Sequence, residues 1–218
     1  MIELEDVRAV YARTIALDHV DLSIGDGITG LYGPNGSGKS TLLRVIAGLH
    51  RPARGHVRFD GAPRRMSDES LRRRIGYAGH EAGLYARLSV EENLSLFAAL
   101  WGASRDRVPV VLEQVGLRDR ARSRVDELSA GLKKRASVAR TLVCEPDILL
   151  LDEPFATLDD ESADLLTAAI KSWRAPGRCA VIATHGAKRL KAFADAAVVL
   201  RRGLVASDRR YDSDEVLR

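Results

Sequence analysis

The order of apolar and polar residues divides the chain into a β-rich opening, a helical middle and a mixed final third. In residues 2–32 apolar and polar groups alternate and glycines punctuate them, which predicts short strands and turns. Residues 40–49 then place leucine, valine and isoleucine at helical spacing, with Gly48 as a stop signal. We therefore expect a strand, a glycine-rich loop and a helix in this order.

Further along, the apolar period is helical from about Val90 to Leu142 and then returns to short β-like runs. Breaks are expected in the helical part at Gly102, Pro109, Gly116 and the 129–131 turn. The later runs are 148–151, 180–184 and 198–201, with one helix from about Ser162 to Trp173. This strand, helix, strand order predicts a parallel sheet. The polar tail from Ser207 is expected to form at most a short terminal helix.

Composition is typical of one globular domain. The 218 residues are 45% apolar and 29% charged, and the longest apolar runs are far shorter than the roughly 18–20 residues that cross a bilayer. Acidic residues in the first six positions do not fit a signal peptide, so we expect a cytosolic chain. Cys144 and Cys179 form no metal-binding pattern and are expected to be buried or idle thiols.

The net charge of +4 arises partly from local basic runs at 72–74 and 133–135. We expect these runs to form a solvated face, with an acidic lipid surface or nucleic acid as the alternative. Charge alone therefore names no partner.

A glycine-rich segment between a predicted strand and a predicted helix has the spacing G-x-x-x-x-G-K-[ST]. Its residues are Gly33, Pro34, Asn35, Gly36, Ser37, Gly38, Lys39, Ser40 and Thr41. Glycines let backbone N–H groups point at phosphates, and the helix N-terminus adds its positive end. We expect Lys39 to reach the β and γ phosphates and the Ser40 hydroxyl to bind Mg²⁺. A coincidental match is expected in roughly one chain of this length in a hundred.

Two acids follow the apolar run 148–151, as expected at the tip of a buried central strand. Asp152 would hold Mg²⁺, and Glu153 would polarise a water against the γ phosphate. The alternative is a strand that ends in solvated acids, and the phosphate loop upstream favours the functional interpretation.

Two further positions point to the same chemistry. Ser129, Ala130 and Gly131 precede a basic helix predicted from about Lys133, so they lie at a helix N-terminus that either is an ordinary cap or receives an anion from a second subunit. His185 ends the run 180–184 and would face the same crevice, where it contacts the γ phosphate or makes a structural hydrogen bond.

Together these motifs resemble the ABC ATPase family over nearly the whole chain. The segment 33–41 looks like Walker A, residues 128–131 like the signature, residues 148–153 like Walker B and Leu158-Asp159 like the D-loop. His185 resembles the switch histidine, and Tyr11 resembles the aromatic residue that stacks on adenine.

The resemblance implies a P-loop NTPase α/β fold with a RecA-like parallel sheet, an antiparallel β subdomain and an inserted helical subdomain. It assigns residues 1–82 and 143–205 to the catalytic core, 83–142 to the helical subdomain and 206–218 to a polar tail. It also implies ATP and Mg²⁺ as cofactors and ATP hydrolysis in a head-to-tail dimer, with the signature and D-loop residue Asp159 near the nucleotide.

The resemblance further implies a homodimer or heterodimer that drives a separate integral membrane subunit, on the cytoplasmic face of the cell membrane and with export as the direction. In this family a helix of the membrane subunit docks on the segment from Tyr77 to Leu94. Leu84, Tyr85 and Leu88 would supply apolar contacts there, unless they are buried.

Two positions depart from the family pattern. His80 stands where the family has the glutamine that senses Mg²⁺ and water, and Leu132 stands where glutamine follows the signature glycine. Gly79-His80 and the residues after Asp152 resemble the haem exporter subunit of cytochrome c biogenesis, while drug, lipid or ion exporter subunits share the same features.

Three other classes compete with a transport ATPase. A soluble ABC protein of DNA repair or of ribosomes would carry long coiled coils or two such domains, and this chain has neither pattern, which argues against a nucleic-acid partner. A module that binds ATP without hydrolysing it is disfavoured by Glu153 and His185. A P-loop kinase gives no reason for the 129–131 turn.

Overall fold

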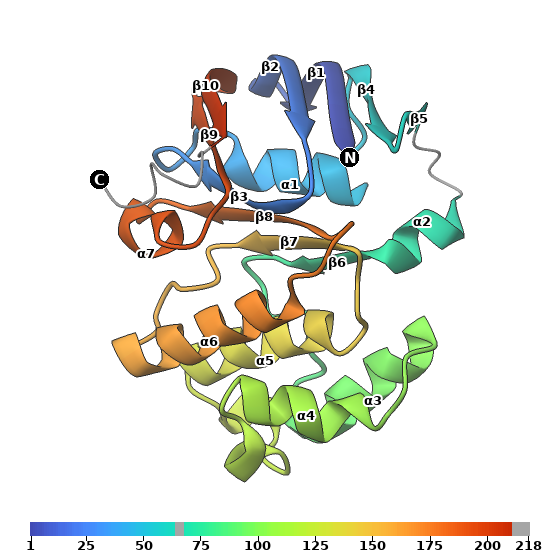
Figure 1. Cartoon of the computed structure of the whole chain (residues 1–218), viewed down its shortest axis with the longest axis vertical. Coiled ribbons are helices and arrows are strands. Elements are labelled where there is room, and N and C mark those ends of the chain that lie inside the picture. The colour runs from blue at the N-terminus through green and yellow to red at the C-terminus, as the bar shows by residue number, and fades with distance from the viewer. Residues whose placement is uncertain (64–67, 211–218) are drawn as a thin grey trace.

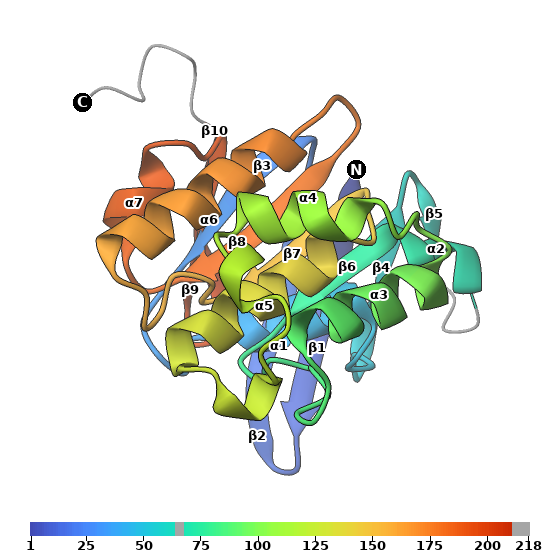
Figure 2. The same cartoon turned by 90° about the horizontal axis from the view of Figure 1, so that it is seen from below.

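The computed structural model describes residues 1–63 and 68–210. Figure 1 shows a layered arrangement, with an antiparallel sheet above, a central sheet in the middle and a group of helices below. Seen from below in Figure 2, the helices α3, α4, α5 and α6 cover one face of the central sheet. None of the described helices is both long and apolar enough to span a bilayer.

The upper sheet is antiparallel, in the order β2-β1-β4-β5. Its strands are β1 (Ile2–Tyr11), β2 (Thr14–Ile24), β4 (Arg54–Phe59) and β5 (Ala62–Pro63). The antiparallel β subdomain is thus confirmed, but β1 and β2 are ten and eleven residues long rather than short. An irregularity between Leu4 and Val7 keeps the buried residues of β1 on one face despite their uneven spacing.

The central sheet has the order β10-β9-β3-β8-β7-β6. Its strands are β3 (Gly27–Tyr32), β6 (Ile75–Ala78), β7 (Ile148–Asp152), β8 (Cys179–Thr184), β9 (Ala196–Arg201) and β10 (Leu204–Arg210). All neighbours are parallel except β9 and β10. The predicted parallel sheet is confirmed.

The helical tail expected from Ser207 is wrong for its described part, which is the second half of β10. Arg202 and Gly203 both have positive φ, and this tight turn returns the chain beside β9. Residues 211–218 of the predicted polar tail lie outside the described residues.

Helices connect the strands. They are α1 (Lys39–Ala47), α2 (Glu69–Arg74), α3 (Val90–Trp101), α4 (Arg107–Gln114), α5 (Ala130–Leu142), α6 (Asp160–Trp173) and α7 (Ala187–Lys191), with 3₁₀ turns η1 (Arg118–Arg120) and η2 (Val125–Glu127). Gly102 and Gly116 lie at helix ends as predicted. Pro109 does not break a helix, because it lies in the first turn of α4, where its missing N–H needs no partner. The short helix α7 between β8 and β9 was not expected.

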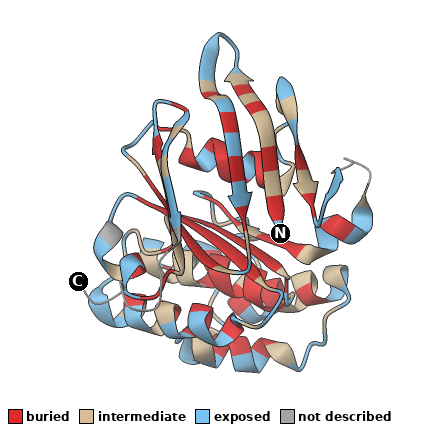
Figure 3. Ribbon diagram, turned by 45° about the horizontal axis from the view of Figure 1, so that its top comes forward, coloured by how far each residue is buried: buried red, intermediate tan, exposed pale blue. Residues whose placement is uncertain are grey.

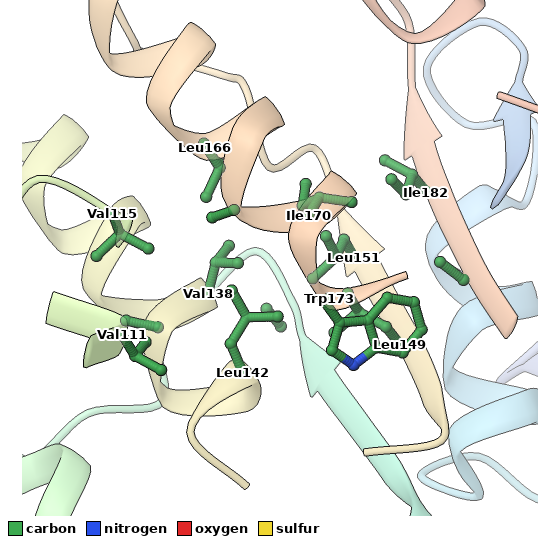
Figure 4. Close-up of a cluster of buried hydrophobic side chains, with 14 of the residues drawn as sticks. Val111, Val115, Val138, Leu142, Leu149, Leu151, Leu166, Ile170, Trp173 and Ile182 are labelled. Carbon is green, nitrogen blue, oxygen red and sulfur yellow. The ribbon is translucent and has the colours of Figure 1, made fainter. Parts of the chain in front are cut away.

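Two apolar clusters lie on opposite faces of the central sheet. Along β7, Leu149 and Leu151 face the helices below, whereas Leu150 faces α1 and the upper sheet. Figure 4 shows the lower cluster, where Val138 of α5 and Ile170 of α6 lie over this face of the sheet, and Figure 3 shows the central strands as almost entirely buried. Because α5 packs on β6 as well as on α3, the packing is continuous across the proposed boundary at residue 142.

Candidate functional site

The carboxyl ends of four parallel strands meet at one edge of the central sheet. Tyr32 of β3 pairs with Thr184 of β8, Asp152 of β7 pairs with Ala183, and Ala78 of β6 pairs with Leu151. The segments that follow these strands carry the glycine-rich loop, His185, Glu153 and His80. The sheet register thus brings the separate sequence motifs to the same edge, where α/β folds bind ligands.

The glycine-rich loop connects β3 to α1 and is held tightly by its surroundings. Gly33 has a φ of 151°, and a Cβ there would lie 2.4 Å from the Leu200 carbonyl oxygen and 2.6 Å from Ser37 Oγ. Gly38 has a φ of 106°, and a Cβ there would lie 2.7 Å from the Ala16 carbonyl oxygen. Only glycine fits these positions without displacing backbone.

Lys39, the first residue of α1, is buried within this loop. Its ammonium donates hydrogen bonds to the carbonyl oxygens of Gly33 at 2.7 Å and Pro34 at 3.1 Å. Gly38 precedes the helix without a side-chain cap, so the first N–H groups of α1 are free of any capping side chain. Ser40 is exposed, while Thr41 is buried. The loop therefore presents a cation and backbone donors together.

Asp152 and Glu153 differ in environment although they are neighbours. Asp152 is the last residue of β7 and is buried, whereas the Glu153 side chain is 20% exposed. Glu153 has a φ of 49°, a costly conformation for a residue with a side chain, and its N–H donates to the Ala183 carbonyl oxygen at 2.9 Å. This backbone turn directs the carboxylate towards His185, whose Nδ1 lies 3.0 Å from Glu153 Oε1.

Tyr11 is the last residue of β1, and His80 follows the end of β6. The Tyr11 ring at the end of β1 stacks on His50, with ring centroids 4.3 Å apart. The pKa of Arg44 is raised above its usual value, because its guanidinium can donate towards the nearby hydroxyl oxygens of Tyr77 and Tyr11. His80 is exposed and lines a groove that also contains Arg44 and Tyr77. Arg44 thus lies near both Tyr11 and the wall of this groove.

The groove has a volume of about 490 Å³ and runs along the edge strand β6, with α1 on one side and α3 and α5 on the other. Its apolar part includes Leu49, Phe97 and Trp101, and Arg140 donates to the Tyr77 carbonyl oxygen within it at 2.7 Å. Of the predicted docking residues, Tyr85 is 55% exposed and its ring centroid lies 6.3 Å from that of Phe97. Leu84 instead packs partly buried against the core. The sequence reasoning missed Leu49, Phe97 and Trp101, because their spacing also fits ordinary core positions.

The start of α5 is exposed at Ser129 and Ala130. The helix begins at Ala130, three residues before the predicted start at Lys133, and Ser129 Oγ accepts a hydrogen bond from the Leu132 N–H at 3.3 Å. A Cβ on Gly131 would lie 3.1 Å from the Thr157 carbonyl oxygen. Leu132 is partly buried against the core cluster, which gives a packing reason for an apolar residue where the family pattern has glutamine.

Asp159 has a structural role in the described chain. It precedes α6, and its carboxylate accepts a hydrogen bond from the Ser162 N–H at 2.7 Å. That backbone hydrogen bond, with one from the Ser162 side chain, holds the pKa of Asp159 below its usual value. Contact between Asp159 and a nucleotide stays a prediction.

The expectation of a solvated face is wrong for the basic run 133–135. Lys134 is half-buried and donates to the carbonyl oxygens of Gly79 and Asp152, and Arg135 donates to the Val115 and Gly116 carbonyl oxygens at 3.1 and 3.0 Å. Sequence reasoning missed these roles because three adjacent basic residues give no sign of which one turns inward. In contrast, Arg72 and Arg73 of the other run are exposed.

The burial of the two thiols agrees with the prediction. Cys179 is buried and Cys144 is partly buried, and neither forms a disulfide. Burial raises the pKa of Cys144 to about 11 and that of Cys179 to about 12.

The donors at this edge fit a magnesium nucleotide. Carboxylate and hydroxyl oxygens suit Mg²⁺, which keeps several waters and takes other ligands from phosphates. Asp152 and Ser40 supply one oxygen donor each, and among the described residues no group of three His, Cys, Asp or Glu offers a competing metal site. With Lys39 inside the loop, the edge has the arrangement of residues that P-loop proteins use to bind nucleotides.

Comparisons with known proteins identify the family within this class. Residues 17–156 match the ABC transporter family. The chain is 37% identical over 190 residues to the Nod factor export ATP-binding protein I of Cupriavidus pinatubonensis, covering 85% of this chain and 58% of that protein. It is 34% identical over 218 residues to the methionine import ATP-binding protein MetN of Brucella abortus, covering 95% of this chain and 59% of that protein.

A solved structure agrees with this assignment. The chain superposes with a TM-score of 0.89 and 27% identity on an ATP-binding cassette dimer in a post-hydrolysis state bound to ADP and phosphate, covering 98% of this chain and 100% of that one. The chain belongs to the ABC transporter family and has the fold of its ATP-binding cassettes. It spans about three fifths of the length of the two curated relatives.

Proposed function

We propose that this cassette hydrolyses ATP in a head-to-tail dimer and thereby drives an integral membrane subunit at the cytoplasmic face of the membrane. The observation that carries the proposal is the placement of Glu153 against His185, at the sheet edge that also holds the Lys39 loop and Asp152. Enzymes that hydrolyse nucleotides need such an acid beside the phosphate-binding loop, where it can activate the water that attacks the γ phosphate.

In the proposed reaction, the uncapped N–H groups of α1 and the Lys39 ammonium bind the phosphates. Lys39 exchanges its hydrogen bonds to the loop carbonyls for bonds to phosphate oxygens. Ser40 and Asp152 would hold Mg²⁺, which supplies charge neutralisation for the transferred phosphoryl group. Glu153 accepts a proton from the attacking water, and His185 orients the Glu153 carboxylate through Nδ1 and contacts the γ phosphate.

Remaining site residues receive supporting roles. Tyr11 has one ring face covered by His50, so we propose that adenine stacks on the other face. His80 takes the position of the sensing glutamine at the end of β6 and would contact the metal-bound water. Ser129 and Gly131 would cover the nucleotide of a second subunit, with Ala130 and Asp159 nearby.

The proposed reaction is tested by phosphate release. The purified chain with MgATP should release phosphate, and removal of Mg²⁺ by EDTA should abolish this release, because the phosphate charge is then no longer neutralised. Magnesium-independent release, or none with MgATP both with and without the membrane subunit, would contradict the proposal.

We propose that the membrane subunit docks at the groove along the edge strand β6. Exposed apolar side chains near its rim, Leu49 at 64% and Tyr85 at 55%, favour contact with another protein. Leu49→Asp and Tyr85→Asp should reduce co-purification of the membrane subunit, while Leu204→Asp on β10, 49% exposed, serves as the matched control. Undiminished co-purification with both groove variants would place docking elsewhere.

Export is our proposed direction, supported by the Nod factor export relative, although the methionine import relative is almost as similar. Haem, or a drug, lipid or ion, is the proposed class of cargo. Capture of the membrane subunit from native membranes, followed by transport into inside-out vesicles, tests both points. Cargo taken up by such vesicles indicates export, and ATP-dependent loss of preloaded cargo from them would contradict it.

A further inference from the structure

Lys134 joins two parts of the chain that the sequence keeps far apart. It lies in the second turn of α5, and its ammonium donates to the carbonyl oxygens of Gly79 at 3.3 Å and Asp152 at 3.4 Å. These carbonyl groups immediately precede His80 and Glu153 in the sequence. One side chain therefore holds the backbone just before both residues.

The surroundings of Lys134 favour a fixed ammonium group. Burial lowers its pKa, while the nearby carboxylates of Asp152 and Glu153 act in the opposite direction. A partly buried charge is retained when hydrogen bonds and opposite charges compensate for lost hydration. Here two carbonyl oxygens and two carboxylates supply that compensation.

We propose that Lys134 is a positioning residue that couples the start of α5 to the orientation of Glu153 and His80 in its own subunit. The inference rests on the proposed function, in which the start of α5 covers the nucleotide of the second subunit. Closure over that nucleotide would shift α5, and the Lys134 hydrogen bonds would pass the shift to the strand ends of β6 and β7. The orientation of Glu153 and His80 in one subunit would thus depend on whether the other subunit has nucleotide bound.

The neighbouring lysine provides a matched control. Lys133 lies on the same helix and its ammonium also donates to a backbone carbonyl oxygen, that of Asp126 at 3.3 Å. Asp126 belongs to η2 and not to a strand end at the site. Lys133→Met and Lys134→Met therefore remove the same chemical group, but only the second releases the Gly79 and Asp152 carbonyl groups.

The test measures phosphate release by the full chain against MgATP concentration, with nucleotide affinity and melting temperature in parallel. Lys134→Met should lower kcat about 10- to 100-fold, because small displacements of a catalytic group have effects of this size. Its KM and nucleotide affinity should stay close to wild type, and its Hill coefficient should fall towards one. Lys134→Arg should restore much of kcat, and Lys133→Met should resemble wild type.

Two results would overturn the inference in a wild-type chain that hydrolyses ATP. One is a Lys134→Met variant with the kcat and Hill coefficient of Lys133→Met. The other is that Lys134→Met and Lys134→Arg lose kcat to the same extent and also lose melting temperature to the same extent. That result would indicate only a structural role for Lys134. A wild-type chain without hydrolysis would overturn the proposed function itself and this inference with it.

Discussion

The loop at residues 33–41 and the start of α5 both lead into a helix, yet the chain treats the two helix N-termini differently. At α1, Gly38 offers no side-chain cap and Lys39 is buried behind the loop. At α5, Ser129 is exposed and caps the Leu132 N–H itself. The first N-terminus keeps its donors for a ligand, whereas at the second the Ser129 cap occupies one N–H group and the start of the helix is exposed.

This difference shows which contacts to a nucleotide a single chain can supply without a second subunit. Asp152, Glu153 and His185 follow or end neighbouring strands, and they lie at the same sheet edge as the glycine-rich loop within one subunit. At the start of α5, Gly131 lies against Thr157 of its own chain, whereas Ser129 is exposed. We therefore expect variants of the first region to affect chemistry and binding strongly, and variants of the second to have smaller effects on the isolated chain.

The largest expected effect is on the chemical step. Glu153→Gln should lower kcat by roughly 10²- to 10⁴-fold, because an amide cannot accept the proton of the attacking water. Nucleotide affinity should remain, since the phosphate loop is unchanged. Steady-state phosphate release and fluorescent-nucleotide binding measure the two properties. Glu161→Gln, on the exposed surface of α6, is the control, and near-normal turnover of Glu153→Gln would remove Glu153 from its role.

The next effect is on nucleotide binding by the loop. Lys39→Met should weaken MgATP binding about 10- to 100-fold, the loss expected for hydrogen bonds to a charged group worth about 1.5–3 kcal/mol. Isothermal titration of the purified variant checks this. Unchanged affinity would mean that Lys39 keeps its bonds to Gly33 and Pro34 in the bound state.

A smaller effect is expected at the start of α5. Ser129→Ala removes the cap of the Leu132 N–H and should reduce the free energy of unfolding by about 1 kcal/mol. Urea unfolding measures this loss. MgATP binding to the monomer should be unaffected, and a Ser129→Ala variant that binds nucleotide tenfold more weakly as a monomer would break the distinction between the two regions.

The smallest effect is expected from thiol reagents. The raised pKa values, about 11 for Cys144 and about 12 for Cys179, leave both groups as neutral thiols at neutral pH, and the thiolate is the reactive form. Labelling of the folded chain should be slow and should not alter nucleotide binding or the start of α5. Unfolding in urea should make both thiols accessible to the reagent. Rapid labelling of the folded chain at pH 7 would contradict the buried placement.

Much of the fold followed from periodicity, because apolar runs such as 148–151 and 180–184 have few alternatives to buried parallel strands. The errors have local causes. Pro109 signals a break only in a helix interior, and a first-turn position removes that penalty. The polar segment after the turn at Arg202 and Gly203 forms a strand, because hydrogen bonding with β9 outweighs the low strand propensity of its polar residues.

The site motifs were visible in the sequence, but their connections were not. The spacing around Lys39 and the acids after residue 151 point to phosphate and metal chemistry on their own. The stacking of His50 on Tyr11 and the inward turn of Lys134 depend on contacts between segments distant in sequence, which no local pattern encodes.

The central claim is that two copies of the chain close around ATP, and the most direct measurement is the solution mass of the Glu153→Gln variant by sedimentation. With MgATP the variant should have twice the mass of the 218-residue chain, and without nucleotide it should be a monomer. A Glu153→Gln variant that binds MgATP yet stays monomeric at every nucleotide concentration would contradict the claim.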